Sequence, residues 1–158
     1  KKATMNELLT KGIGHTEFKD SELGRIPKSW ECVKMAYIAK VTDGAHKTPK
    51  YMDSGVPFLR VTDIHSTEID IKKTKYISTK EHLELCKRCH PERGDILYSK
   101  NGTIGISKII DWDWDFSIFV SLALLKLHDK DSLRIEFLDL YLQSPVVAKQ
   151  IKATGKRA

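Results

Sequence analysis

A short polar stretch at residues 99–103 carries side chains that suit contact with a nucleic acid, namely Ser99, Lys100, Asn101 and Thr103. An amide can pair with the edge of adenine, and an ammonium can contact phosphate oxygens or guanine. Asn101-Gly102 stands between apolar, β-branched runs, and Asn-Gly is typical of a type I′ hairpin turn with φ > 0 at both central residues. The sequence therefore predicts a tight hairpin that presents these side chains together. An ordinary polar turn facing water is the alternative.

A second polar loop, at residues 43–51, combines basic groups with an aromatic ring. Its sequence is DGAHKTPKY. Lysines can neutralise phosphates, and a tyrosine can pack against a nucleotide or donate a hydrogen bond. Composition alone leaves a solvated loop as an equal alternative. The apolar run that follows, PFLRV at 57–61, carries one charge on Arg60, which must reach solvent or a partner.

The segment CKRCH at 86–90 has the spacing of covalent haem attachment and of half a zinc site. Haem attachment requires export, and the N-terminus has no apolar signal region. His82 could add a fourth zinc ligand, but no second pair of ligands follows at a finger-like distance. We instead predict a helix over residues 79–89, with Thr79 as its N-cap and with Leu83, Cys86 and Cys89 facing the core.

A weak match to metal-dependent nucleases lies at Asp70-Ile71-Lys72, with Asp53 or Asp63 upstream. Such a pattern would hold Mg²⁺ between carboxylates and place a lysine beside the phosphate. Short charged patterns arise by chance in a chain that is 30% charged. Alternating apolar and charged residues at 69–72 favour a half-buried strand.

Composition and charge fit one soluble globular domain with an anionic partner. The chain has 158 residues, 41% of them hydrophobic, and 27 basic against 21 acidic residues give a net charge of +6. Three cysteines do not form a secreted disulfide framework, and no apolar stretch is long enough for a membrane span. We therefore expect a cytoplasmic protein. Motifs for nucleotide hydrolysis, dinucleotide binding and serine hydrolases are missing from the sequence.

The hydrophobic pattern predicts alternating strands and short helices. Helices are expected at 1–9, 35–38 and 133–142 and after Ser144, an N-cap followed by proline, with Gly155 ending the last one before a basic tail. Residues 10–29 are interpreted as a linker, and strands are expected at 30–33, 39–42, 57–61, around 75–77, at 96–99 and at 103–110. The apolar run 116–127 predicts one central strand, and the DWDWD loop at 111–115 is expected to cover the edge of the core with its tryptophans.

Five motifs occur in order along the chain: IPxxW from residue 26, DGxHxxPxY from 43, GVPFLRV from 55, GDILYSxxGTIG from 94 and FLxxYLxSP from 137. Together they resemble the target-recognition domains of the specificity subunits of type I restriction-modification systems. The match runs from about residue 26 to the end of the sequence. Each motif is loose alone, and their shared order makes the resemblance fairly specific.

The resemblance implies a mixed α/β domain, with a twisted, largely antiparallel sheet flanked by short helices. Residues 26–158 would form this domain, and residues 1–25 would be a spacer-helix tail and linker. We therefore interpret the chain as a fragment with the second recognition domain. The domain would read half of a bipartite double-stranded DNA target without catalysis of its own. Its partners would be a methyltransferase subunit that flips and methylates adenine, and a restriction and translocase subunit. In the full-length chain it would also work with another recognition domain, which reads the other half of the target. S-adenosylmethionine, ATP and Mg²⁺ would belong to partner subunits, and this chain would need no cofactor.

Carried onto this sequence, the resemblance implies DNA contacts from both polar segments and their neighbours. Lys47, Lys50 and Lys100 would mainly position phosphates, and Thr48, Ser99 and Asn101 could reach base edges. The other candidates are His46, Tyr51, Arg60, Thr62, Tyr98 and Thr103. Two alternatives stay open: a protein–protein adaptor that uses the same loops, and a nuclease that would need Asp70 and Lys72 beside a second carboxylate in one cleft.

Overall fold

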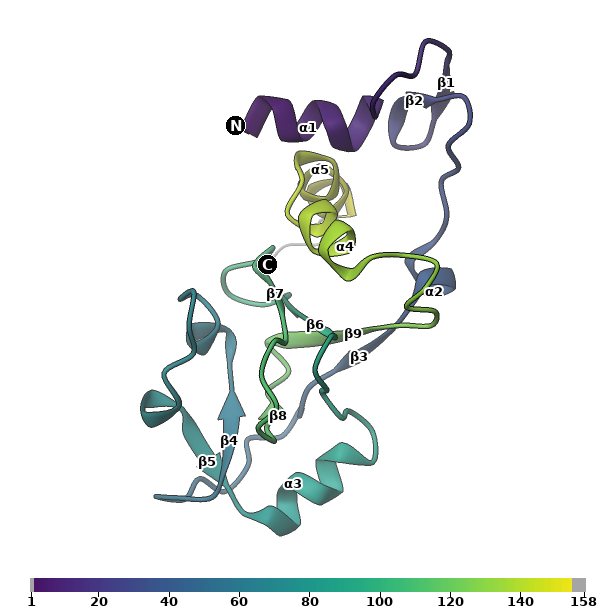
Figure 1. Ribbon diagram of the computed structural model, residues 1–158. Helices are drawn as coiled ribbons and strands as arrows, with labels where there is room; N and C mark the ends of the chain where they lie inside the picture. Colours follow the sequence, from purple (N-terminus) through teal and green to yellow (C-terminus); the bar gives the residue numbers. More distant parts are fainter. Residues whose placement is uncertain (1, 155–158) are drawn as a thin grey trace.

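The computed structural model of the chain describes residues 2–154, and the predicted helix end at Gly155 and the basic tail at 155–158 lie outside this range. Helix α1 (Lys2–Lys11) packs with a hairpin of β1 (Phe18–Ser21) and β2 (Gly24–Pro27) at one end of the molecule (Figure 1). The predicted linker at 10–29 thus contains a hairpin that the sequence reading missed. The predicted strand at 30–33 is wrong, because these residues form no regular element.

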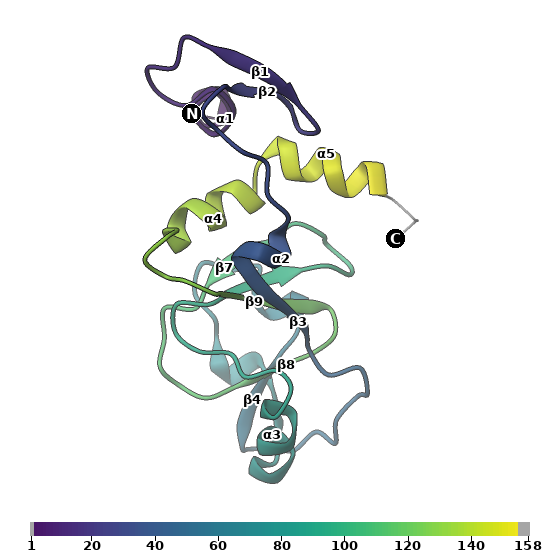
Figure 2. The ribbon, with the colours of Figure 1, turned by 90° about the vertical axis from the view of Figure 1, so that its right-hand side faces the viewer.

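A four-stranded antiparallel sheet forms the centre of the fold. Its order is β3 (Ala39–Asp43), β9 (Leu122–Leu127), β6 (Ile96–Ser99) and β7 (Ser107–Ile109). Short α2 (Met35–Ile38), α4 (Ile135–Leu142) and α5 (Pro145–Thr154) lie on one side of this sheet (Figure 2). Leu138 and Leu142 of α4 pack on Ile96 and Leu125, whereas Phe137 is 45% exposed. Burial of these apolar side chains fixes α4 to the sheet.

A three-stranded sheet of order β5-β4-β8 completes the core. Strand β4 (Val56–Leu59) pairs antiparallel with β5 (Lys75–Ile77) and parallel with β8 (Ser117–Ile118). Phe58 and Leu59 are fully buried here. Helix α3 (Thr79–Cys86) and the 3₁₀ turns η1 (Val61–Asp63) and η2 (Ile71–Lys73) surround this sheet. The predicted mixed α/β class with largely antiparallel strands is confirmed, although the strands divide into separate sheets.

The apolar run 116–127 does not form the single strand that its composition predicts. It divides into β8 and β9, which belong to different sheets, and a turn at Phe119 to Ser121 separates them. Leu122 N–H donates to the Phe119 carbonyl at 2.9 Å, which closes this turn. Continuous burial hid the break, because an apolar run looks the same whether it crosses one sheet or two.

Two further local predictions are wrong in detail. Residues 69–72 are not a half-buried strand, because η2 occupies 71–73 and the Asp70 carboxylate accepts from Lys72 N–H at 3.1 Å. Helix α3 begins after Ser78, whose hydroxyl accepts from Glu81 N–H, and not after Thr79. Leu83, predicted to face the core, is 60% exposed, and His82 is buried instead. The helix ends at Cys86 rather than at residue 89, so the buried Cys89 follows it.

Other predictions are confirmed. Helix α5 begins after Ser144, whose hydroxyl accepts from Val147 N–H at 3.4 Å. Trp112 and Trp114 stack with ring centroids 5.1 Å apart and pack beside buried Phe116, so they cover the edge of the core. Within residues 2–154, we find no helix long and apolar enough to span a membrane.

Candidate nucleic-acid interface

The connection between β6 and β7 is wider than the predicted tight hairpin. Residues 100–106, called loop 100–106 below, separate the two strands. Gly102 has a φ of 77°, but Asn101 does not have the positive φ that a type I′ turn requires. The Ser99 hydroxyl instead accepts from Ile106 N–H at 2.8 Å, and the Ser99 carbonyl accepts from Gly105 N–H at 3.1 Å. Ser99 thus closes the base of a longer loop, and the predicted strand start at 103 is wrong.

Two of the predicted DNA contacts therefore do not lie at the loop surface. Ser99 is fully buried and its hydroxyl is used inside the loop, so it does not present a donor to a base edge. Tyr98 points to the opposite face of the sheet, where it packs with the cluster around Leu138 and Leu142. Its buried hydroxyl has no hydrogen-bond partner among the described residues. Consecutive side chains of a strand point to opposite faces of the sheet, so Tyr98 and Ser99 face opposite sides.

Ser121, in the turn between β8 and β9, joins two of the candidate segments. Its hydroxyl accepts from Val61 N–H at 3.1 Å, and its carbonyl accepts from Lys100 N–H at 3.0 Å and Asn101 N–H at 3.4 Å. This Ser121 junction brings loop 100–106 beside η1, which carries Thr62. Sequence reasoning missed Ser121, although a hydroxyl inside an apolar run signals a buried hydrogen bond.

Lys100 is fixed at its side chain as well as its backbone. Its ammonium lies 2.7 Å from an Asp43 carboxylate oxygen at the end of β3, and His46 Nε2 lies 3.5 Å from the other oxygen. The hydrogen bond from Lys100 lowers the pKa of Asp43 despite partial desolvation, and the charges of His46 and Arg88 act in the same direction. Sequence reasoning did not identify Asp43 as part of the site.

The start of the second polar segment, loop 44–51, is held tightly against the core. Arg88 donates from one guanidinium nitrogen to the carbonyls of Asp43 at 2.9 Å and Gly44 at 2.7 Å. Ala45 N–H donates to the Ile118 carbonyl at 2.8 Å. A Cβ at Gly44 would lie only 2.3 Å from the Phe119 carbonyl oxygen, so only glycine fits at this close approach.

The middle of loop 44–51 is open to solvent. His46, Lys47, Thr48 and Lys50 are all exposed. At the far end, the Tyr51 ring lies 6.2 Å from the Phe58 ring and 5.7 Å from the Lys75 ammonium. These contacts anchor this end of the loop, although Tyr51 remains 38% exposed.

Arg60, like Lys100, is already paired with a carboxylate of the chain, whereas Lys47 and Lys50 are exposed. Its guanidinium contacts both Asp63 carboxylate oxygens, at 3.2 and 3.3 Å, and its backbone N–H donates to one of them at 2.8 Å. Asp63 is thereby engaged in capping η1, and Asp70 pairs with Lys73 at 3.1 Å. These contacts give the nuclease alternative no support. Asp63 and Asp70 each pair with a different basic side chain of this chain instead of meeting at one metal site.

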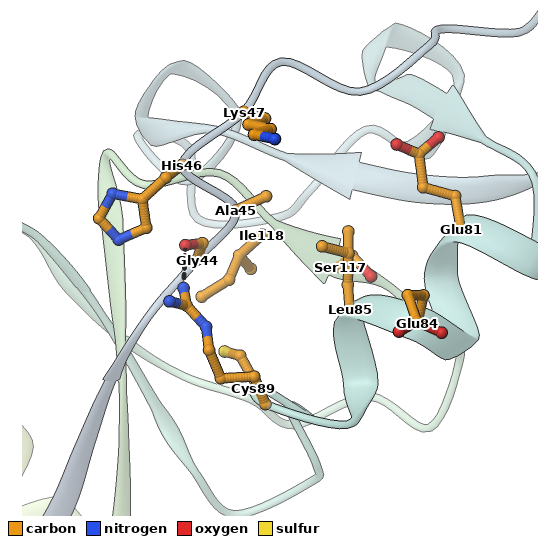
Figure 3. Close-up of a pocket in the computed structure, with 11 residues that line it drawn as sticks. Gly44, Ala45, His46, Lys47, Glu81, Glu84, Leu85, Cys89, Ser117 and Ile118 are labelled. Atoms are coloured by element: carbon orange, nitrogen blue, oxygen red, sulfur yellow. Dashed lines mark hydrogen bonds between the residues drawn. The ribbon is translucent and has the colours of Figure 1, made fainter.

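A pocket of about 380 Å³ lies between the start of loop 44–51 and α3 (Figure 3). His46 and Lys47 stand on one side of it, and Glu81 and Glu84 of α3 stand on the other. Such facing opposite charges are suited to a polar contact but form no row of like charge for a phosphate backbone.

Ser117, which lines this pocket, has its hydroxyl 2.9 Å from His82 Nδ1, and this contact ties α3 to β8. Burial lowers the pKa of His82, raises that of Cys86 and raises that of Cys89 to about 11. Both thiols are therefore protonated at neutral pH and are poor metal ligands in this state. No group of three or more metal-ligating side chains comes together within residues 2–154.

Comparison with known proteins agrees with the five sequence motifs. The chain is 38% identical over 146 residues to the putative type I restriction enzyme MjaX specificity subunit of Methanocaldococcus jannaschii, covering 89% of this chain and 34% of that protein. It is 30% identical over 120 residues to the MjaVIII specificity subunit from the same organism, covering 70% of this chain and 28% of the relative. The chain thus spans about a third of the length of these relatives. No protein-family model matches it.

The fold is similar to that of a solved structure. The crystal structure of the HsdS subunit from Thermoanaerobacter tengcongensis superposes with a TM-score of 0.65 and 18% identity, over 94% of this chain and 33% of that one. Together with the curated relatives, this likeness confirms the resemblance to a target-recognition domain.

Proposed function

We propose that this chain, a relative of type I restriction enzyme specificity subunits, reads one half of a bipartite DNA target. The observation that carries the proposal is the Ser121 junction, which joins loop 100–106 to η1 while Lys100 reaches Asp43 at the start of loop 44–51. Segments far apart in the sequence thus offer one discontinuous polar surface. A base-reading surface needs donors and acceptors held in fixed directions, and these contacts supply that rigidity.

The exposed polar groups of this surface suit both kinds of DNA contact. Lys47 and Lys50 would bind phosphates, and the chain's net charge of +6 would favour approach to DNA. Asn101, Thr48, Thr62 and Thr103 are exposed and would be the candidates for base edges.

The chain would act without catalysis of its own. It would present the bound target to a methyltransferase subunit and to a restriction and translocase subunit, with a second recognition domain reading the other half-site. S-adenosylmethionine, ATP and Mg²⁺ would be bound by those partners. In support, the curated relatives are named specificity subunits, a name that describes the choice of target.

The proposal is tested by measuring affinity for random duplex DNA, and then for a selected pool, between about 50 and 200 mM salt. Affinity should fall steeply with salt, and Lys47→Ala should make the slope of log K against log salt shallower by about 0.9. Asn101→Ala should relax the sequence choice without a comparable change in slope. Lys19→Ala is the matched control, since this exposed lysine lies on β1 at the opposite end of the molecule (Figure 1).

Failure of the proposal has a clear signature. If the chain shows no salt-dependent binding, even when combined with a methyltransferase subunit, it does not read DNA. The protein–protein adaptor would then be the better explanation of the two loops.

A further inference from the structure

The pairing of Lys100 with Asp43 is an unusual feature for a surface that binds DNA. The carboxylate lies 2.7 Å from the ammonium, and the side chains of Asp43 and Lys100 remain 39% and 30% exposed. The pair is therefore reachable from solvent although its two members are held together. A lysine that only bound phosphate would gain nothing from this partner, because the carboxylate repels phosphate oxygens.

Both members of the pair are positioned by contacts outside it. Lys100 N–H donates to the Ser121 carbonyl at 3.0 Å, and Arg88 donates to the Asp43 carbonyl at 2.9 Å. Asp43 also ends β3, where it is in register with Ala123 of the central strand β9. A donor and an acceptor are thus fixed side by side at the rim of the sheet, which is the preorganisation that base reading requires.

This arrangement matches the chemistry of one base pair. In the major groove, guanine shows two acceptors, O6 and N7, and its partner cytosine shows the N4 amino donor. A lysine donates to the guanine acceptors, and an aspartate accepts from cytosine N4. An adjacent ammonium and carboxylate are complementary to that edge, whereas each phosphate offers acceptors only.

We propose that Asp43 and Lys100 form a specificity-determining pair that reads one G·C base pair in the DNA half-site. This inference rests on the proposed function and changes the role of Lys100 from a phosphate contact to a base contact. Lys47 and Lys50, which make no ion pair among the described residues, remain the phosphate contacts.

The test is selection of bound sequences from a randomised duplex pool by the whole chain and by its Asp43→Asn variant. Asparagine keeps the size of the side chain, but its amide favours adenine, so one G·C position of the selected motif should lose its preference. The preference for G·C over other base pairs at that position should fall roughly 5- to 150-fold, which is the cost of losing one good base contact. Lys100→Gln should affect the same position, and circular dichroism would show that both variants fold.

Asp70→Asn is the matched control, because Asp70 also pairs with a lysine, Lys73 of η2, at 3.1 Å, and lies outside the two loops. It should leave the selected motif unchanged. If Asp43→Asn selects an unchanged motif and binds all sequences more tightly, the inference is overturned. Asp43 would then only weaken DNA binding by repelling phosphates. If the wild-type chain selects no motif at all, also with its methyltransferase partner, the proposed function itself fails and the inference with it.

Discussion

Loops 44–51 and 100–106 both carry lysine and threonine side chains but differ in how the fold holds them. Loop 100–106 is held at its base by Ser99 and at residues 100 and 101 by Ser121, and its one lysine is paired. Loop 44–51 is fixed at its two ends and leaves Lys47 and Lys50 exposed between them. Fixed side chains suit recognition of base edges, and exposed, unpaired lysines suit phosphates. The difference therefore suggests that loop 100–106 recognises bases and loop 44–51 binds phosphates.

The largest effect should follow from Gly44→Ala, which attacks the fixed start of loop 44–51. The new Cβ would lie 2.3 Å from the Phe119 carbonyl oxygen and 2.4 Å from that of Ile118, so strand β8 must shift. We expect the free energy of unfolding to fall by about 3 kcal/mol, as for severe overpacking. Urea denaturation measures this value, and a loss well below about 1 kcal/mol would contradict the close approach.

Ser99→Ala should have the next largest effect, because it opens the base of loop 100–106. Without the hydroxyl, Ile106 N–H loses its acceptor at 2.8 Å in a buried setting. The expected cost is about 1–3 kcal/mol in the free energy of unfolding, with looser choice of DNA sequence. Thr103→Ala in the same loop is the control: it is exposed and should stay within about 0.5 kcal/mol of wild type.

The support beneath loop 44–51 should depend on pH through His82. Burial lowers the pKa of this imidazole in the folded state below its ordinary value of 6.5. The unfolded chain therefore binds a proton first as the pH falls, and stability drops progressively below about pH 6.5, by at most about 1.4 kcal/mol per pH unit. Denaturation at pH 7.5, 6.5 and 5.5 should show a flatter dependence for His82→Gln. An equal slope in both proteins would assign the effect to other groups.

The smallest effect on stability should come from Lys50→Ala, in the free part of loop 44–51. The side chain is exposed, so the free energy of unfolding should change by less than about 0.5 kcal/mol. The salt dependence of DNA binding should nevertheless become shallower, by about 0.9 in the slope of log K against log salt. A change of sequence choice with an unchanged slope would contradict the division between the two loops.

Much of the fold was accessible from sequence because the signals were local. The α2 turn, strand β3 and the Ser144 cap of α5 follow from hydrophobic period and capping chemistry. The β1–β2 hairpin and the break in the run 116–127 were not accessible. The β1–β2 segment lacks a strong apolar pattern. The break in the run 116–127 arises because its two halves belong to different sheets, which the sequence of the run does not show.

The candidate site divides in the same way. Exposed residues such as Lys47 and Asn101 were identified from their types alone. The burial of Ser99, the opposite orientation of Tyr98 and the pairing of Lys100 with Asp43 were missed. Asp43 and Lys100 are far apart in sequence, and only the pairing of β3 and β6 with β9 brings them together.

The place of β9 has a consequence for how the protein is made. This strand lies between β3 and β6 in the sheet, yet it follows both in the chain. During synthesis, β3 and the inner edge of β6 have no pairing strand until β9, which ends at residue 127, has left the ribosome, because β9 pairs with both of them. Open strand edges promote association between chains. Rapid closure by the apolar run of β9 therefore protects the nascent chain, and mutations that weaken β9 should first appear as loss of soluble protein in cells.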